Sequence, residues 1–318
     1  MNNFNIIVLD SASIGDDIDF SVFERFGTVK VYLSTTPEEF KKRAANADII
    51  IQNKYKLNSE SLKYAPSLKL VCEAATGFDN IDLEYCRSHG IAVTNVPGYS
   101  TECVAQLTFA MALNIIMHLP EYTSFVSNGS YTASGIANRL TPQFNELSGK
   151  TWGIVGLGNI GKKVAQIAKA FGCKVIACKR TPDENYDCTD IDTLCQKSDI
   201  ISIHTPLNDS TRSLIGEKQI GIMKKSAILL NLARGAVVDE EAVASAVLDG
   251  RIAGFGCDVY SVEPFPTEHP YTKLLSLPNV CLTPHIAWGA YETRVRLVGE
   301  MAENISAFTV NKRHNRVD

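Results

Sequence analysis

Short apolar runs alternate with longer segments of mixed polarity almost from one end of the chain to the other. The runs, such as "NIIVL", "DIIIQ" and "AILLN", are rich in β-branched residues and bounded by polar or turn residues. Runs of this kind are typical of strands buried on both faces, and the mixed segments are typical of helices. Their alternation predicts an α/β fold, in which helices cover both faces of parallel sheets.

The predicted strands form two series. The first comprises residues 6–9, 29–33, 48–52, 70–73 and 92–95. The second comprises residues 151–155, 174–178, 199–204, 227–231, 252–258 and 280–283. Because 318 residues are about twice the usual size of a domain, we expect two doubly wound parallel-sheet domains.

Two long helical segments flank the second series. The first, "YSTECVAQLTFAMALNIIMHLP", has an N-cap at Ser100 or Thr101 and ends near Pro120, and we interpret it as a spacer helix between domains. The second spans residues 289–310 and is expected to return to the first series, which lacks a closing helix. The charged tail "NKRHNRVD" is expected to be frayed.

Composition and charge argue against several functional classes. A formal net charge of -4 and the lack of a basic tract argue against a nucleic-acid partner. The apolar run from Ile6 to Leu9 is too short for a signal peptide or a membrane span, so a cytoplasmic protein without a membrane partner is expected. The nine cysteines include no CxxC pair, which indicates reduced thiols and neither disulfides nor a metal site.

The most specific motif is the sequence "GLGNIG" at residues 156–161, between a predicted strand and a helix. Gly156 permits the tight turn, Gly158 lets a pyrophosphate approach the backbone, and Gly161 lets helix and strand pack closely. The N–H groups of Asn159 and Ile160 would then face the phosphates. A tight packing turn is the alternative, but the context of strand, turn and helix favours dinucleotide binding.

Two cations stand at the end of the next predicted strand. Lys179 lies 18 residues after Gly161 and is followed by Arg180 and Thr181. An acid near this point binds the adenosine ribose of NAD, whereas a cation would attract the 2′-phosphate of NADP. We therefore predict NADP or NAD as cofactor, with NADP slightly favoured; a solvated surface pair is the alternative.

Further polar residues end the later strands of the same series. His204, Thr205 and Pro206 are expected to face adenine and ribose, with His204 as a packing residue or backbone contact. An arginine, a carboxylate and a histidine beside a nicotinamide would supply a fork for a substrate carboxylate, a partner for an imidazolium and a proton donor. The alternatives are a surface charge, a turn residue and a buried structural histidine. The candidates at these strand ends are Leu232, Ala233 and Asp258 as cofactor contacts, Arg234, Glu263 and His285 as the chemical set, and Trp288 in the segment after His285.

These motifs together resemble a known family. The chain is similar to the D-isomer-specific 2-hydroxyacid dehydrogenases, and most similar to their glycerate dehydrogenase and hydroxypyruvate reductase branch. The resemblance rests on "AATGFDNID", "NVPGYSTECVAQLTFAMAL", "LSGKTWGIVGLGNIG", "HTPL", "NLARGAVVDEEAV", "DVYSVEP" and "LTPHIAWGA".

The resemblance implies a discontinuous arrangement of domains. A Rossmann NAD(P)-binding domain, residues 99–288, would be inserted into a flavodoxin-like substrate domain, residues 1–98 and 289–318. It also implies a homodimer built through the nucleotide domains, including the long helix and the segment 120–149.

The resemblance also implies the site residues. Arg234 would bind the substrate carboxylate and carbonyl, His285 would be the acid–base residue, and Glu263 would orient His285 and favour its protonated form. The implied reaction is reduction of a small 2-keto acid, hydroxypyruvate or glyoxylate first, to the D-2-hydroxy acid with NAD(P)H. The implied substrate-binding residues are Asn53, Ala75, Thr76, Gly77, Arg234, His285 and Trp288, with Lys54 beside Asn53.

Several alternatives share this fold. They are D-lactate and phosphoglycerate dehydrogenases, formate dehydrogenases, and a nucleotide-sensing scaffold similar to transcriptional corepressors. Glu263 disfavours the formate enzymes, which pair Gln with the catalytic His. Only about one helix follows Trp288, where phosphoglycerate enzymes often carry an added regulatory domain. The lack of extended disordered tails and of a basic region disfavours the scaffold.

Overall fold

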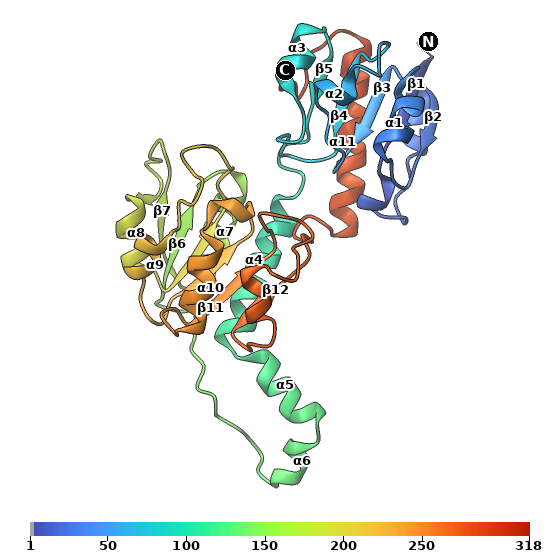
Figure 1. The fold of residues 1–318 in the computed structure, drawn as a ribbon. Coiled ribbons are helices and arrows are strands. Elements are labelled where there is room, and N and C mark those ends of the chain that lie inside the picture. The colour runs from blue at the N-terminus through green and yellow to red at the C-terminus, as the bar shows by residue number, and fades with distance from the viewer. Residues whose placement is uncertain (1–2) are drawn as a thin grey trace. The chain divides into compact units, whose positions relative to one another are not determined.

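Both expected sheets are present, and every strand pair in them is parallel. The computed structural model describes residues 3–318. The chain divides into two units, which are described separately (Figure 1). Unit 1 contains the chain up to Ser100 together with Gly289–Asp318, and unit 2 contains Thr101–Trp288.

The sheet of unit 1 has five strands in the order β2-β1-β3-β4-β5. This is the strand order of flavodoxin-like doubly wound sheets. The strands are β1 Phe4–Val8, β2 Gly27–Val31, β3 Ile49–Gln52, β4 Leu70–Glu73 and β5 Ala92–Thr94. The helices are α1 Pro37–Ala44, α2 Ser59–Leu62, α3 Leu83–Ser88 and α11 Tyr291–Thr309, the last of which buries Leu297, Met301 and Ile305.

The expectation that the last eight residues are frayed is wrong. The N–H of Val317 donates to the carbonyl of Val93 at 3.0 Å, and Arg316 forms an antiparallel bridge with Thr94. The carboxylate of Asp318 accepts the N–H of Val93 at 2.8 Å. The tail is ordered because β5 is an edge strand, whose N–H and C=O groups need partners.

The sheet of unit 2 has seven strands in the order β12-β11-β10-β9-β6-β7-β8. The chain order reverses between β6 and β9, as in a Rossmann fold, where ligands bind at the carboxyl ends of the strands near this switch point. β8 was not predicted, because a two-residue strand has too little pattern to be read from sequence. The strands are β6 Thr151–Val155, β7 Lys174–Cys178, β8 Asp187–Cys188, β9 Ile200–Ile203, β10 Ile228–Asn231, β11 Gly254–Cys257 and β12 Val280–Leu282.

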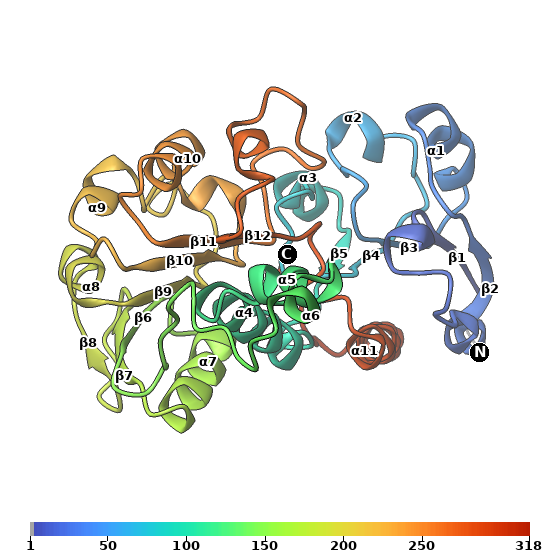
Figure 2. The same cartoon turned by 90° about the horizontal axis from the view of Figure 1, so that it is seen from below.

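Two hydrophobic cores lie on opposite faces of this sheet. Ile154 and Leu230 belong to one core, and their neighbours Val155 and Leu229 belong to the other, because side chains alternate along a strand. Figure 2 shows α4 and α7 on one face and α9 and α10 on the other. The helices are α4 Thr101–Ile116, α7 Asn159–Ala170, α8 Ile191–Lys197, α9 Glu217–Gly221 and α10 Glu240–Leu248.

The interpretation of α4 as a spacer helix is wrong. Its residues Phe109, Met111 and Ala112 are buried in the core of unit 2, and the ring of Phe109 lies 4.5 Å from that of Trp152. The sequence is apolar on most sides of the helix, which is typical of a helix that covers a sheet.

Two further helices project away from the sheet of unit 2 (Figure 1). They are α5 Leu119–Ser127 and α6 Ser130–Ser134, and neither contains a buried residue. Within residues 3–318, no single helix is both long and apolar enough to cross a membrane. Taken together, α4 and α5 have the length and composition of a membrane span, but the two helices are bent by 66° at their junction.

Candidate active site

The glycine-rich turn has the geometry that a dinucleotide requires. Gly156 has a φ of 95°, and a Cβ there would lie 2.7 Å from the backbone of His204 and Thr205. A Cβ on Gly161 would lie 2.1 Å from the carbonyl oxygen of Gly156, whereas one on Gly158 would meet nothing within 4 Å. The first and third glycines therefore allow close packing, and the second leaves the backbone open to a ligand.

The helix after this turn begins without a side-chain cap. α7 begins at Asn159, followed by Ile160, and Gly158 at its N-cap provides no hydrogen-bonding side chain. The first N–H groups of an α-helix have no partner within the helix, and they carry its positive partial charge. The N-terminus of α7 thus suits a pyrophosphate.

An unpartnered imidazole lies at the end of β9. Both ring nitrogens of His204 are shielded from solvent, and neither has a hydrogen-bond partner among residues 3–318. Burial lowers the pKa of His204 to about 3, so the ring is neutral. A buried polar atom without a partner is rare in proteins and calls for a ligand or water. With Thr205 against Gly156 and Pro206 next in the loop, His204 fits a place beside a bound coenzyme.

The loop after β7 carries the predicted cations and one acid that sequence reasoning missed. Lys179 is partly buried, Arg180 and Thr181 are exposed, and neither cation forms an ion pair with another described residue. Asp183 lies in the same loop, and its carboxylate pairs with Lys162 of α7 at 2.8 Å. Hydrogen bonds from Lys162 and Asn185 lower the pKa of Asp183 to about 2. The charge of this acid is therefore engaged away from Lys179.

The turn after β10 is shaped by a buried asparagine. The side chain of Asn231 donates to the carbonyl of Arg234 at 3.0 Å and accepts the N–H of Ala233 at 3.2 Å. Leu232 between them is buried. Arg234 in turn donates from Nη1 to the carbonyl of Ala233 at 2.9 Å. Sequence reasoning missed Asn231, for which the only signal is its place at a strand end.

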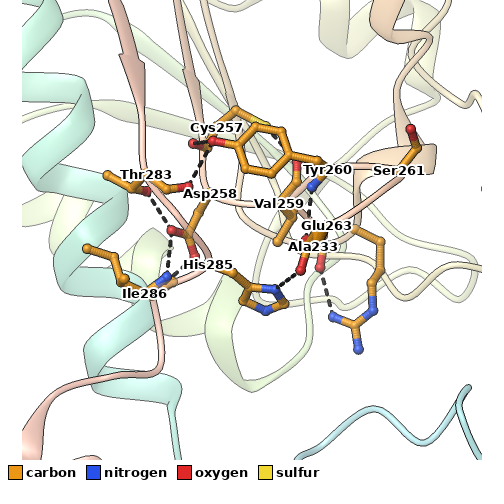
Figure 3. A network of polar contacts seen from close by, with 12 residues as sticks. Ala233, Cys257, Asp258, Val259, Tyr260, Ser261, Glu263, Thr283, His285 and Ile286 are labelled. Carbon is orange, nitrogen blue, oxygen red and sulfur yellow. Dashed lines mark hydrogen bonds and ion pairs between the residues drawn. The ribbon is translucent and has the colours of Figure 1, made fainter. Parts of the chain in front are cut away.

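Glu263 and His285 form a close pair. Nδ1 of His285 lies 2.6 Å from Oε2 of Glu263, and the N–H of Tyr260 donates to Oε1 of Glu263 at 3.0 Å. Because an ionised carboxylate only accepts, Nδ1 carries the proton, which leaves Nε2 as the other functional atom of the ring. Figure 3 shows the imidazole of His285 pointing toward Glu263.

Asp258 fixes the backbone of the turn that carries His285. His285 has a φ of 55°, a conformation that is costly for a residue with a side chain. The carboxylate of Asp258 accepts the N–H groups of Ile286 and Ala287, both at 2.8 Å, and the hydroxyl of Thr283 at 2.5 Å. Burial raises the pKa of Asp258 despite these bonds. Its expected contact with the cofactor stays a prediction.

Unit 1 contains the loop that the sequence assigned to a substrate carboxylate. The carbonyl of Ala75 accepts from the N–H of Val96 at 2.9 Å, and that of Thr76 accepts from the side chain of Asn95 at 2.7 Å. The N–H groups of Ala75, Thr76 and Gly77 donate to no other residue in the described part of the chain. Neighbouring N–H groups without a protein acceptor are available to an anion.

A second loop of unit 1 supports the first. The side chain of Asn53 donates to the carbonyl of Ala74 at 2.7 Å. The carboxylate of Asp10 accepts the N–H of Asn53 at 3.0 Å and that of Lys54 at 2.6 Å. Asp10 and Asn95 are thus parts of the loop framework that sequence reasoning missed, because their partners lie far away in the chain.

Trp288 ends unit 2 and is partly buried, next to the buried Ala287.

Over residues 3–318 the structure contains no group of three or more His, Cys, Asp or Glu side chains that could hold a metal ion.

Fold and site together define a class of protein. Asn231 ends β10, and Asp258 and Thr283 directly follow β11 and β12. The loops after these strands therefore share the edge at which β6 leads into the glycine-rich turn. An imidazole with a carboxylate partner at this edge suits acid–base chemistry beside a bound dinucleotide, as a nicotinamide-dependent dehydrogenase requires.

Comparison with known proteins identifies the family. The model for "D-isomer specific 2-hydroxyacid dehydrogenase, NAD binding domain" matches residues 109–287. The chain is 35% identical to the glycerate dehydrogenase of Methylorubrum extorquens over 314 residues, 98% of either chain. It is 41% identical to the glyoxylate reductase of Thermococcus litoralis over 260 residues, 80% of this chain and 77% of that one.

A solved structure agrees. The NADPH-dependent glyoxylate/hydroxypyruvate reductase of Sinorhizobium meliloti, in complex with NADP and malonate, is 28% identical with a TM-score of 0.86. The match covers 99% of this chain and 97% of that one. The chain belongs to the D-isomer-specific 2-hydroxyacid dehydrogenase family, in its glycerate dehydrogenase and hydroxypyruvate reductase branch. It is an NAD(P)-dependent oxidoreductase that acts on a CH–OH group, as predicted.

Proposed function

We propose that the protein reduces a small 2-keto acid, hydroxypyruvate or glyoxylate first, to the D-2-hydroxy acid, with His285 as the proton donor. The observation that carries this proposal is the 2.6 Å pair of His285 and Glu263 in the unit that holds the glycine-rich turn. The names of the glycerate dehydrogenase and glyoxylate reductase relatives support the choice of substrates.

The chemistry follows from the protonation of this pair. Glu263 accepts the Nδ1–H of His285, so the Nε2–H of the protonated ring is the group that donates its proton to the oxygen that develops charge on the substrate. The coenzyme, when bound, supplies the hydride to the keto carbon. Once neutral, His285 remains hydrogen-bonded to Glu263 through Nδ1 and takes up a new proton from solvent, because its side chain is 25% exposed.

Arg234 is proposed to hold the substrate. Its guanidinium has the planar fork that binds a carboxylate and an adjacent carbonyl oxygen together. A substrate contact of the N–H groups in the loop of Ala75, Thr76 and Gly77 stays a prediction. Asn53 positions that loop through Ala74, whereas direct substrate contacts of Asn53 and Trp288 stay predictions.

We propose NADPH as the preferred coenzyme, with NADH accepted. The support is that Lys179 and Arg180 follow β7, the strand whose end binds the adenosine ribose in this fold, and that the nearby acid Asp183 is paired with Lys162. The neutral ring of His204 and the backbone N–H groups at the N-terminus of α7 would also contact the coenzyme. Leu232 and Ala233 stay predicted cofactor contacts.

We propose that the protein is a homodimer in which the segment from α5 to residue 144 meets the second copy. This segment exposes several apolar side chains, including Val126 at 59%, Ile136 at 64% and Leu140 at 74%. Large exposed apolar patches mark interaction sites in soluble proteins. Sedimentation should show a dimer that the pair Ile136→Asp and Leu140→Asp converts to a monomer; a monomeric native protein would contradict the proposal. A cytoplasmic location stays a prediction.

The test of the reaction is an assay of the purified protein with hydroxypyruvate, glyoxylate and pyruvate, each with NADPH and NADH. Turnover of hydroxypyruvate or glyoxylate above that of pyruvate is expected. Preferred turnover of pyruvate would replace the proposed specificity by that of a D-lactate dehydrogenase. Tight coenzyme binding without turnover of any keto acid would instead support the scaffold alternative.

A further inference from the structure

A buried carboxylate outside the proposed chemistry contacts the loop that carries Glu263. Glu240 is the first residue of α10, and only 12% of its side chain is exposed. Its Oε1 accepts the N–H of Ser261 at 2.9 Å. Its Oε2 accepts the hydroxyl of Ser261 and a ring nitrogen of His269, the latter at 3.0 Å. Three donors from two other segments thus converge on Glu240.

His269 is held in one tautomer by its own surroundings. The N–H of Tyr271 donates to Nδ1 of His269 at 3.2 Å, so Nδ1 is the unprotonated acceptor and Nε2–H donates to Glu240. The His269 side chain is 5% exposed. Its ring lies 4.9 Å from those of Phe265 and Tyr271 and 6.2 Å from that of Tyr260. Ring packing and hydrogen bonds therefore both hold the imidazole of His269.

Two consecutive backbone N–H groups connect the Glu240–His269 pair to Glu263. The N–H of Tyr260 donates to Glu263, and the next N–H, that of Ser261, donates to Glu240. Phe265, two residues beyond Glu263, packs on His269. The loop that bears Glu263 is therefore anchored on both sides of that residue.

The same segment also contacts the turn of Arg234. A Cβ on Gly235 would lie 2.0 Å from the carbonyl carbon of Tyr260 and 2.1 Å from the nitrogen of Ser261. The backbones of the two loops are thus in direct contact. Glu240 follows Arg234 by six positions, so one short segment supplies both the proposed substrate arginine and the anchor of the Glu263 loop.

We propose that Glu240 and His269 are positioning residues that hold Glu263 against His285; this inference rests on the proposed function. Neither residue is assigned a contact with the substrate. With glutamine at position 240, one carboxylate oxygen becomes an NH2 group, so either the N–H of Ser261 or the Nε2–H of His269 loses its acceptor and faces a donor. The loop from Tyr260 to Phe265 then gains freedom. Small misplacements of this kind reduce the rate of a chemical step far more than they reduce binding.

The test is Glu240→Gln in the full-length protein, with Glu241→Gln as the matched control. Glu241 is the next residue of the same helix, has a side chain that is 67% exposed, and approaches Lys273 only at 3.9 Å. We expect Glu240→Gln to lower kcat for keto-acid reduction by roughly tenfold or more, with the dissociation constant of the coenzyme unchanged. Glu241→Gln should leave both unchanged. Equal kcat values for the two variants would overturn the proposal.

A double-mutant cycle separates positioning from a general loss of stability. If Glu240 acts through Glu263, its replacement should have little further effect on kcat in a Glu263→Gln background. A full, multiplicative effect in that background would overturn the proposal. His269→Phe keeps the aromatic packing, removes the donor, and is expected to lower kcat in the same direction. Tryptophan fluorescence during urea unfolding checks that unit 2 is folded, since Trp152 and Trp288 both lie in it.

Different results would contradict the proposed function and the positioning role of Glu240 and His269. If Glu263→Gln and His285→Ala leave kcat unchanged, the proposed function is wrong, whatever the effect of Glu240→Gln. If those two variants lose activity while Glu240→Gln and His269→Phe do not, only the positioning role is wrong.

Discussion

Glu263 accepts a hydrogen bond from Nδ1 of His285 over 2.6 Å, although 22 residues separate them in the chain. The contact assigns a tautomer as well as a partner. Since Nδ1 carries a proton that is bonded to the carboxylate, only Nε2 can exchange a proton with a substrate. Acid–base work by this pair is therefore confined to one ring atom, Nε2.

Replacing this histidine should abolish the chemical step and spare coenzyme binding. We expect His285→Ala to lower kcat by roughly 10²–10⁴-fold, the usual contribution of a general acid. Coenzyme affinity, measured by titration of the reduced coenzyme's fluorescence, should stay within about twofold. His314→Ala, at an exposed histidine, is the control. Unchanged turnover in His285→Ala would remove His285 from the acid role.

Replacing the proposed substrate arginine should affect binding of the keto acid. Arg234→Lys keeps the charge but loses the fork that makes two parallel hydrogen bonds, so KM for the keto acid should rise by about tenfold or more. The exposed Arg212 provides a control through Arg212→Lys. Steady-state kinetics at saturating coenzyme measures the effect, and an unaltered KM would argue for a surface role of Arg234.

Reversing the charge at the adenosine end should change the coenzyme preference. Lys179→Asp would repel a 2′-phosphate and could bind the ribose hydroxyls, so the ratio of kcat/KM for NADPH to that for NADH should fall by about tenfold or more. Lys174→Asp, at the opposite end of β7, controls for the change of net charge. The surface-pair alternative is correct if both variants keep the native ratio.

The neutral His204 should make the stability of unit 2 depend on pH. Its folded pKa of about 3 lies below the ordinary value of 6.5, so the unfolded chain binds a proton that the folded chain does not. The free energy of unfolding is therefore highest above pH 6.5 and falls as the pH drops from 6.5 toward 3. Between pH 7 and pH 5 this one group should account for about 2 kcal/mol.

The measurement is urea unfolding of the native protein and of His204→Phe at pH 7 and pH 5, followed by tryptophan fluorescence. The variant should lose less stability than the native protein over this interval, whatever its stability at pH 7. An equal loss in both proteins would show that His204 does not titrate in this way. Bound NADPH should stabilise the native protein against urea by mass action.

Much of the fold was determined by local pattern. The apolar runs and their spacing were enough to predict eleven of the twelve strands, because a strand buried on both faces must be apolar along its whole length. The glycine-rich turn could also be predicted from the sequence, since close backbone contacts leave no room for a Cβ at Gly156 and Gly161. The candidate residues Arg234, Glu263 and His285 were found because they stand at strand ends.

Tertiary structure alone decided which of these groups meet. Sequence gives no reason for Asp258 to hold the backbone after His285, for Glu240 to hold Ser261 and His269, or for Lys162 to pair with Asp183 and keep that acid from Lys179. Each contact joins residues far apart in the chain or from different elements. The same holds for the tail, whose order depends on an unpaired edge of β5, and for α4, whose apolar surface is explained only by the sheet beneath it. Local sequence fixes where a polar group stands, and packing fixes what it faces.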